Sequence, residues 1–263
     1  MDSKTLSPRE KRRYAKQIMI PEIGLEGQQK LKMAKVLVVG AGGLGCPALQ
    51  YLTTAGIGKI GLAEFDVVDE SNLQRQILYG STDVGKLKCI IAKDRLAQLN
   101  PLIELEIYNL RCDPDNSLQV MTNYDIIVDA TDNIESRYLI NDACVILGKP
   151  MVHGSIYGFE GIISVFNFKG GPTYRCYNPD NKDEYKNPLP KDVGLFGVLP
   201  GIIGTYAANE VLKIITGTGE VLSGKLLLIN ILNNTFKTFK VNNIPENHNI
   251  PLSRFAGFPQ KER

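Results

Sequence analysis

The chain contains the stretch KVLVVGAGGLG, residues 35–45, in which an apolar, β-branched run meets a cluster of glycines. The run predicts a buried strand, and the apolar spacing that follows predicts a helix. Gly40, Gly42 and Gly45 occupy the first, third and sixth places of GxGxxG, a turn that brings backbone amides against a phosphate. The helix N-terminus adds unpaired N–H groups and a partial positive charge. This stretch therefore predicts a nucleotide-binding strand–turn–helix.

Strands and helices continue to alternate after this turn, which favours a parallel, doubly wound α/β sheet. The strands predicted in this part are 59–64, 103–110, 125–129 and 151–155. The helices predicted between them are 85–99, 117–122 and 134–147. The pattern then changes to strands at 161–168 and 171–177, a helix at 199–215, and a hairpin at 224–241. We therefore predict an α/β fold with a doubly wound, mostly parallel, Rossmann-like sheet that is extended by antiparallel C-terminal strands.

Composition and charge argue against several classes of protein. The chain has 263 residues, with 30 Lys and Arg against 28 Asp and Glu, and a net charge of +2. This balance favours binding to neither nucleic acid nor a membrane surface. No apolar run approaches the ~20 residues of a membrane helix, and the polar N-terminus is unlike a signal peptide. Five cysteines without a CxxC pair indicate reduced thiols in a cytoplasmic protein.

Polar residues follow several of the predicted strands. The carboxyl ends of parallel strands meet at one edge of the sheet, where open α/β sheets bind ligands. A lysine in the first turn of a helix opposes the helix dipole, so a nearby anion would account for it. The polar residues in question are Glu64, Asp66, the segment SNLQRQ at 71–76, Lys88, Asp132 and Asn133. Each also has a structural explanation, such as a turn, a helix cap or a salt bridge.

In these motifs the chain resembles the MoeB/ThiF/HesA family, bacterial relatives of the ubiquitin-activating enzymes. The resemblance covers about residues 13–241. Its motifs are RYAKQ at 13–17, GAGGLG at 40–45, SNLQRQ at 71–76, VGKLK at 84–88, DATDN at 129–133 and the segment 194–204. Members of the family use MgATP to adenylate the C-terminal Gly-Gly carboxylate of a small ubiquitin-like sulfur carrier, usually as homodimers. The resemblance implies the same activity, ATP and Mg²⁺, and the same kind of partner here.

The resemblance also implies how the nucleotide is held. Catalysis of adenylation consists mostly of positioning and of neutralising phosphate charge. Glu64 would bond both ribose hydroxyls, with Asp66 as the second candidate. The residues that would hold backbone against adenosine and phosphate are Gly40, Gly42, Gly43 and Gly45.

The phosphates and the metal have their own implied residues. Arg75 and Lys88 would clamp phosphate oxygens. Asp132 would hold Mg²⁺, a hard cation suited to one carboxylate plus phosphates and water, with Asn133 beside it. The rest of the 71–76 segment would contribute to the same site through Ser71, Asn72, Leu73, Gln74 and Gln76.

Residues 1–241 would then form a single ThiF-like adenylation domain. Its nucleotide-binding part would cover about 33–155, and a partner-binding extension about 156–241. Residues 242–263 show little apolar periodicity, so we expect a polar tail without regular structure.

The chain departs from the family pattern at three places. Lys16 stands where many relatives have an arginine that reaches the partner subunit's ATP, which keeps the charge but loses the bidentate fork. Relatives commonly bind zinc through two CxxC pairs, whereas here Cys176 alone remains, so we predict no zinc. Pro190 occupies the place of a cysteine that can accept the activated carboxyl group, so we expect a free acyl-adenylate as product.

Three other interpretations remain open. An NAD-dependent oxidoreductase would explain the glycines and Glu64 but would leave Arg75, Lys88 and Asp132 without a role. The related ATP-dependent enzyme that cyclises a threonylcarbamoyl-modified tRNA adenosine shares the fold. A non-catalytic half of a heterodimeric activating enzyme would not need the two cations together with Asp132. The product that receives the sulfur, whether thiazole, molybdopterin or another, is set by the partner and its pathway.

Overall fold

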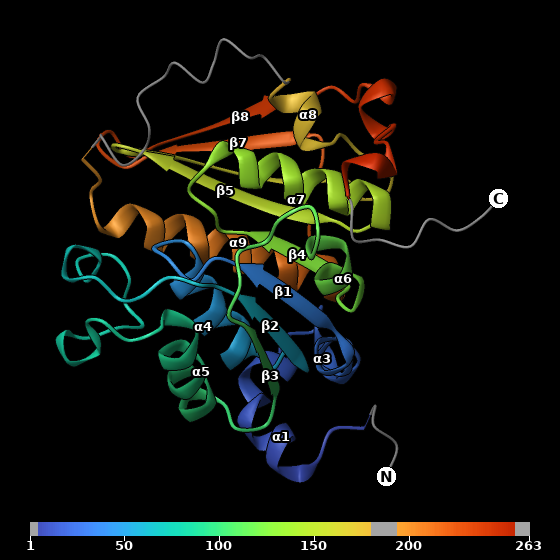
Figure 1. Ribbon diagram of the computed structural model, residues 1–263. Helices are drawn as coiled ribbons and strands as arrows, with labels where there is room; N and C mark the ends of the chain where they lie inside the picture. The colour runs from blue at the N-terminus through green and yellow to red at the C-terminus, as the bar shows by residue number, and fades with distance from the viewer. Residues whose placement is uncertain (1–4, 180–193, 256–263) are drawn as a thin grey trace.

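The computed structural model describes residues 5–179 and 194–255. Within them, eight strands form one continuous sheet (Figure 1). The spatial order is β3 (Glu104–Tyr108), β2 (Lys59–Ala63), β1 (Lys35–Val39), β4 (Ile126–Asp129), β5 (Met151–Tyr157), β6 (Glu160–Phe166), β7 (Lys225–Asn230) and β8 (Thr235–Lys240). The first five strands of this order pair in parallel, and β6, β7 and β8 join antiparallel. The predicted mixed sheet is confirmed.

Helices cover both faces of the sheet, with α7 and α9 on opposite sides (Figure 1). One face carries α3 (Gly24–Met33), α4 (Gly45–Ala55), α5 (Lys88–Leu99) and α9 (Val198–Thr216). The other face carries α6 (Ser117–Thr122), α7 (Ile134–Leu147) and α8 (Tyr174–Tyr177). Strand β1 contributes Val36 and Val38 to the first core and Leu37 and Val39 to the second, as the two-residue period of a strand requires.

Two short helices, α1 (Pro8–Arg13) and α2 (Ala15–Ile18), precede these layers. They are separated at Tyr14, whose buried hydroxyl accepts a hydrogen bond from Asn100 Nδ2 at 2.9 Å.

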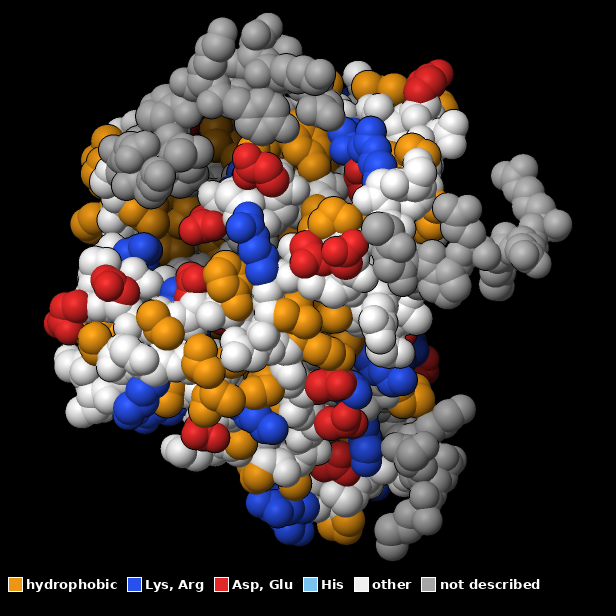
Figure 2. Space-filling model, viewed as in Figure 1, with side chains coloured by type: hydrophobic (Ala, Val, Ile, Leu, Met, Phe, Trp, Pro, Cys, Tyr) orange, Lys and Arg blue, Asp and Glu red, His pale blue; other side chains and the backbone are white. Residues whose placement is uncertain are grey.

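Among the described residues, α9 is the one helix long and apolar enough to cross a membrane by length and composition. It packs against α4, β5 and β6, and Leu199, Ile203 and Val211 are fully buried. Its apolar character is therefore accounted for by the core of the domain. Acidic, basic and hydrophobic side chains are interspersed over the face shown in Figure 2.

The structure corrects two predicted elements. Helix α5 begins at Lys88 and not at residue 85, because Gly85 has a left-handed φ of +82° and Leu87 is extended and forms a β-bridge with Val67. The predicted strand at 171–177 is wrong. Strand β6 is already paired with β5 and β7, so no free edge remains beside it, and the chain forms a loop followed by α8.

The tail also differs from expectation within its described part. Residues 245–248 and 252–254 form 3₁₀ turns, and Phe255 is only 4% exposed in the core beneath α7. Arg254 NH1 lies 2.8 Å from Asp142 Oδ2 on α7. The polar composition of the tail gave no sign of this docking, because few apolar residues take part, chiefly Phe255 and Ile250, and the remaining contacts are polar. Residues 256–263 lie outside the described part of the chain.

Candidate active site

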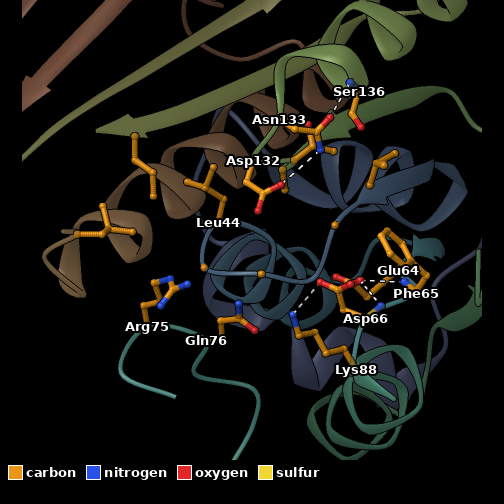
Figure 3. A pocket seen from close by; sticks show the side chains of 18 of the residues that line it. Leu44, Glu64, Phe65, Asp66, Arg75, Gln76, Lys88, Asp132, Asn133 and Ser136 are labelled. Carbon is orange, nitrogen blue, oxygen red and sulfur yellow. Dashed lines mark hydrogen bonds and ion pairs between the residues drawn. The ribbon is translucent and has the colours of Figure 1, made fainter. Parts of the chain in front are cut away.

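A cavity of about 660 Å³ lies where the carboxyl ends of β1, β2 and β4 meet. Figure 3 shows Asp132 and Asn133 on one side of it and Arg75, Gln76 and Lys88 on the other. The predicted site residues that line this cavity are Gly40, Gly42, Gly43, Glu64, Asp66, Ser71, Gln74, Arg75, Gln76, Lys88, Asp132 and Asn133. Motifs that are far apart in the sequence therefore share one cavity.

The glycine turn forms the floor between these two walls. Gly40 has φ +97°, and a Cβ there would lie 2.8 Å from the carbonyl oxygen of Ala130. A Cβ on Gly45 would lie 2.0 Å from the carbonyl oxygen of Gly40, so the protein itself requires both glycines. At Gly42 the nearest atom would be Nε2 of Gln76 at 3.6 Å, an ordinary contact. Gly42 thus leaves space on the cavity side, where a phosphate would approach.

Glu64 is buried at the end of β2, and both of its carboxylate oxygens accept hydrogen bonds from backbone amides. Its Oε2 accepts from the amide of Ala41 at 2.8 Å, and its Oε1 accepts from the amides of Phe65 and Asp66 at 2.8 and 2.9 Å. These bonds fasten the glycine turn to the end of β2. They use most of the acceptor capacity of the carboxylate, which is about four lone-pair sites.

Lys88 and Asp66 form an ion pair on the wall beside Glu64. Lys88 Nζ lies 3.2 Å from Asp66 Oδ2, and the lysine side chain is 5% exposed whereas that of Asp66 is 52% exposed. A buried ammonium group with one partly solvated partner keeps donors for an anion. The Asp66 carboxylate also faces the cavity, so it is available to a ribose hydroxyl.

Arg75 belongs to a turn that places its guanidinium beside the glycines. Its NH1 donates to the carbonyl oxygen of Ser71 at 3.0 Å, and its Cγ would lie 3.5 Å from a Cβ on Gly43. The amides of Arg75 and Gln76 donate to the carbonyl oxygen of Asn72 at 3.0 and 2.9 Å. Asn72 therefore builds the turn and does not itself line the cavity.

Asp132 offers an exposed carboxylate across the cavity from these cations. In the described structure it accepts one hydrogen bond, from Nδ2 of Asn133 at 3.4 Å. Asn133 caps α7, because its Oδ1 accepts from the amide of Ser136 at 2.9 Å. No group of three or more His, Cys, Asp or Glu that could hold a metal ion occurs within the described ranges. A single carboxylate facing a phosphate site fits Mg²⁺, which keeps several waters and phosphate ligands.

Four predicted residues do not line the cavity of their own chain: Gly45, Asn72, Leu73 and Lys16. Gly45 supports the floor from behind. Lys16 is exposed on α2. Arg13, the first residue of the RYAKQ motif, donates to the carbonyl oxygen of Leu99.

Sequence reasoning missed several lining residues, among them Leu110, Arg111, Cys112, Arg137, Tyr157 and Leu195. Arg111 and Cys112 follow β3, and Tyr157 ends β5, so the rule that ligands gather at strand ends could have found them. Arg137 lies inside a helix and carries no such signal.

The cysteines divide into two kinds. Cys46, Cys89, Cys112 and Cys144 are buried, and burial raises the pKa of each thiol. Cys176 is partly exposed. Burial alone would raise the pKa of the Cys176 thiol, but hydrogen bonds from Thr173, from the amide of Ile244 and from Asn247 outweigh burial and lower it. Pro190 lies outside the described residues.

Comparison with known proteins shows the family of this chain. The model of the ThiF family matches residues 14–250. A sulfur carrier protein adenylyltransferase of Thermus thermophilus is 46% identical over 89% of this chain and 88% of its own length. A probable molybdopterin-synthase adenylyltransferase of Porphyra purpurea is 47% identical over 90% of this chain, which spans 62% of that protein.

A solved structure shows the same fold. The crystal structure of E. coli MccB with MccA-N7isoASN has a TM-score of 0.79 at 23% identity, covering 93% of this chain and 75% of that one. The family match extends over most of the chain and includes each motif that lines the cavity. The chain belongs to the ThiF family.

Proposed function

We propose that this chain is an adenylyltransferase that uses MgATP to activate the C-terminal Gly-Gly carboxylate of a small ubiquitin-like sulfur carrier. The observation that carries the proposal is the cavity, which has a glycine-turn floor, Arg75 and Lys88 on one wall and Asp132 on the other. The likeness to the Thermus thermophilus adenylyltransferase over 88% of that protein's length supports it.

The reaction joins the carrier to AMP. A carboxylate oxygen of the carrier forms a bond to the α-phosphorus, the bond from that phosphorus to the bridging oxygen of the β-phosphate breaks, and pyrophosphate leaves with the electron pair. Negative charge accumulates on phosphate oxygens, so cationic donors that are already in place lower the barrier. Arg75 and Lys88 are the donors we assign to this task.

The ribose and the metal are assigned to the two acidic sides of the cavity. Glu64 has about one acceptor site left after its three backbone bonds, so we assign the ribose hydroxyls jointly to Glu64 and the exposed Asp66. Asp132 would hold Mg²⁺, which supplies neutralisation of phosphate charge when bound. The Asp132 carboxylate suits this task because it is exposed and has one weak hydrogen bond among the described residues.

We further propose that the chain acts as a homodimer in the cytoplasm. Lys16 is exposed on α2 and lies outside its own cavity, so a second copy would let it reach the partner's ATP. Met19 and Ile20 next to it are 69% and 45% exposed, which provides apolar surface for such a contact. The five free cysteines suit a reducing compartment.

ATP–pyrophosphate exchange tests this function. The purified chain is mixed with MgATP, labelled pyrophosphate and a Gly-Gly-tailed carrier, and the control carrier lacks its final glycine. We expect exchange with the first carrier and only background exchange with the second. If exchange requires a threonylcarbamoyl-modified tRNA and does not require the carrier, the chain is the cyclising enzyme and not a carrier adenylyltransferase. Binding of NAD in place of ATP would make the chain an oxidoreductase.

A further inference from the structure

A buried hydrogen-bonded pair of side chains lies three residues before Asp132 on β4 and beside it on β5. Asp129 ends β4 and His153 lies beside it in β5, with His153 Nδ1 2.7 Å from Asp129 Oδ2. The two side chains are 0% and 1% exposed. Neither residue lines the cavity, and neither has a task in adenylation as described above.

The protonation of the pair follows from its surroundings. Burial lowers the pKa of His153, so the ring is neutral near pH 7. Burial by itself would raise the pKa of Asp129, but the hydrogen bonds from His153 and Thr131 and the charge of Arg137 outweigh burial and lower it. A carboxylate can only accept, so Nδ1 of the neutral ring carries the proton and donates it to Asp129.

The position of the ring costs the protein free energy. Nε2 of His153 is a buried nitrogen without a hydrogen-bond partner among the described residues. The ring packs against Phe166 and Tyr174, with centroid distances of 5.9 and 5.0 Å. An apolar side chain would fill this place without an orphaned polar atom. The hydrogen bond from Nδ1 to Asp129 is therefore the reason we give for a histidine at this position.

The other oxygen of Asp129 connects the pair to the metal side of the cavity. Asp129 Oδ1 accepts from the amide of Thr131 at 3.1 Å and from its Oγ1 at 2.6 Å. Asp132 is the next residue, and Figure 3 shows its carboxylate facing the cavity. A chain of contacts thus runs from His153 through Asp129 and Thr131 to the backbone that carries Asp132.

We propose that Asp129 and His153 are positioning residues that hold the Thr131–Asp132 turn so that the Asp132 carboxylate meets the metal on the nucleotide. This proposal rests on the proposed function, because it assumes that Asp132 binds Mg²⁺. His153 fixes the Asp129 side chain in one orientation. The Asp129 carboxylate then restricts the backbone at Thr131 and Asp132 through its two hydrogen bonds to Thr131. Loss of such an outer contact typically weakens metal binding by about 10- to 100-fold.

The test measures ATP binding by calorimetry at increasing Mg²⁺ and again in EDTA, with no carrier present. In His153→Leu the donor to Asp129 is lost, and we expect the Mg²⁺ concentration for half-maximal enhancement of ATP binding to rise about 10-fold. ATP affinity in EDTA should stay at the wild-type value. His153→Asn places an amide near the Nδ1 position, so it should restore most of the Mg²⁺ response.

Phe166→Leu is the matched control, because it disturbs packing around the same ring and breaks no hydrogen bond to Asp129. We expect a lowered Tm and an unchanged Mg²⁺ response. If His153→Leu does not fold, Thr131→Val tests the same link, because it removes the hydroxyl that bonds Asp129, and it should weaken the Mg²⁺ response likewise.

The outcomes separate this inference from the proposed function. A wild-type Mg²⁺ response in His153→Leu or in Thr131→Val would overturn the positioning role, provided that Asp132→Ala abolishes the response. An equal loss in Phe166→Leu would overturn it too, because general destabilisation would then suffice. If Asp132→Ala itself keeps the full response, the metal assignment fails and the positioning role fails with it.

Discussion

The parallel and antiparallel halves of the sheet differ in how they use their polar residues. In the parallel half, from β3 to β5, the carboxyl ends of strands place Glu64, Asp66 and Asp132 around one cavity. In the antiparallel half, from β6 to β8, the segments that follow β6 and β8 use polar residues to attach themselves to helix α7. Arg175 and Arg254 both pair with Asp142 on α7.

This difference follows from strand direction. Parallel strands all end at the same edge, so the turns that follow them converge and can surround a ligand. Antiparallel strands end at alternate edges, and the turns between them are dispersed. We therefore expect substitutions in the first half to impair the reaction and substitutions in the second half to impair stability.

Asp132→Ala should have the largest effect on the reaction. Without this carboxylate we expect no measurable ATP–pyrophosphate exchange above background and a nearly unchanged Tm, because the side chain is exposed and weakly bonded. Asp94→Ala, an exposed aspartate on α5 outside the cavity, is the control and should retain exchange. Near-normal exchange in Asp132→Ala would remove this residue from the active site.

Arg75→Ala should reduce exchange by a smaller amount. Loss of one cationic donor to the transition state costs on the order of 2–4 kcal/mol in barrier, and Arg75→Lys should recover part of it because it keeps the charge but not the fork. The measured quantity is kcat/KM for ATP in the exchange reaction, with the carrier at saturating concentration. Arg12→Ala, on the exposed surface of α1, serves for comparison. An equal, small change in both variants would contradict the assignment.

Phe255→Ala should separate stability from activity in the second half. The ring is 4% exposed beneath α7, so its removal should lower the free energy of unfolding by about 3 kcal/mol. Exchange at a temperature below the new Tm should remain near wild type. Chemical denaturation measures the change, and Leu252→Ala, at a site 43% exposed, should cost much less. Loss of exchange without loss of stability would place the tail in the reaction.

Cys176 should show the smallest effect on the reaction and a distinct reactivity. Its lowered pKa means that the thiolate is already populated at a pH where an ordinary cysteine is still protonated. Iodoacetamide should therefore label Cys176 at lower pH and ahead of the four buried thiols, as peptide mass mapping would detect. Thr173→Ala removes a hydrogen bond to the sulfur and should move this labelling to higher pH.

The same cysteine also bears on the product. We expect Cys176→Ala to adenylate the carrier normally and the wild type to form no reducible adduct with it. Non-reducing electrophoresis and intact mass measure both. A reducible adduct that disappears in Cys176→Ala would show a covalent step through this thiol.

Much of the nucleotide site could be predicted from the sequence because the residues that form each part of it are close together in the chain. The β1–turn–α4 unit needs only an apolar run, glycines at fixed spacing and a helical pattern, and the structure requires Gly40 and Gly45 for close backbone contacts. Asp132 and Asn133 follow a buried strand, so their place at the carboxyl edge follows from strand direction alone. Family resemblance then supplied the roles that remain predictions.

Tertiary structure alone decided the features that depend on residues far apart in the chain. The segment at 171–177 became a loop and α8 because both edges of β6 were taken. Glu64 was committed to three backbone amides by the meeting of β2 with the glycine turn. The pairing of His153 with Asp129 required β4 and β5 to lie side by side in register. Hydrogen bonding and burial act between spatial neighbours, and only the folded sheet makes these residues neighbours.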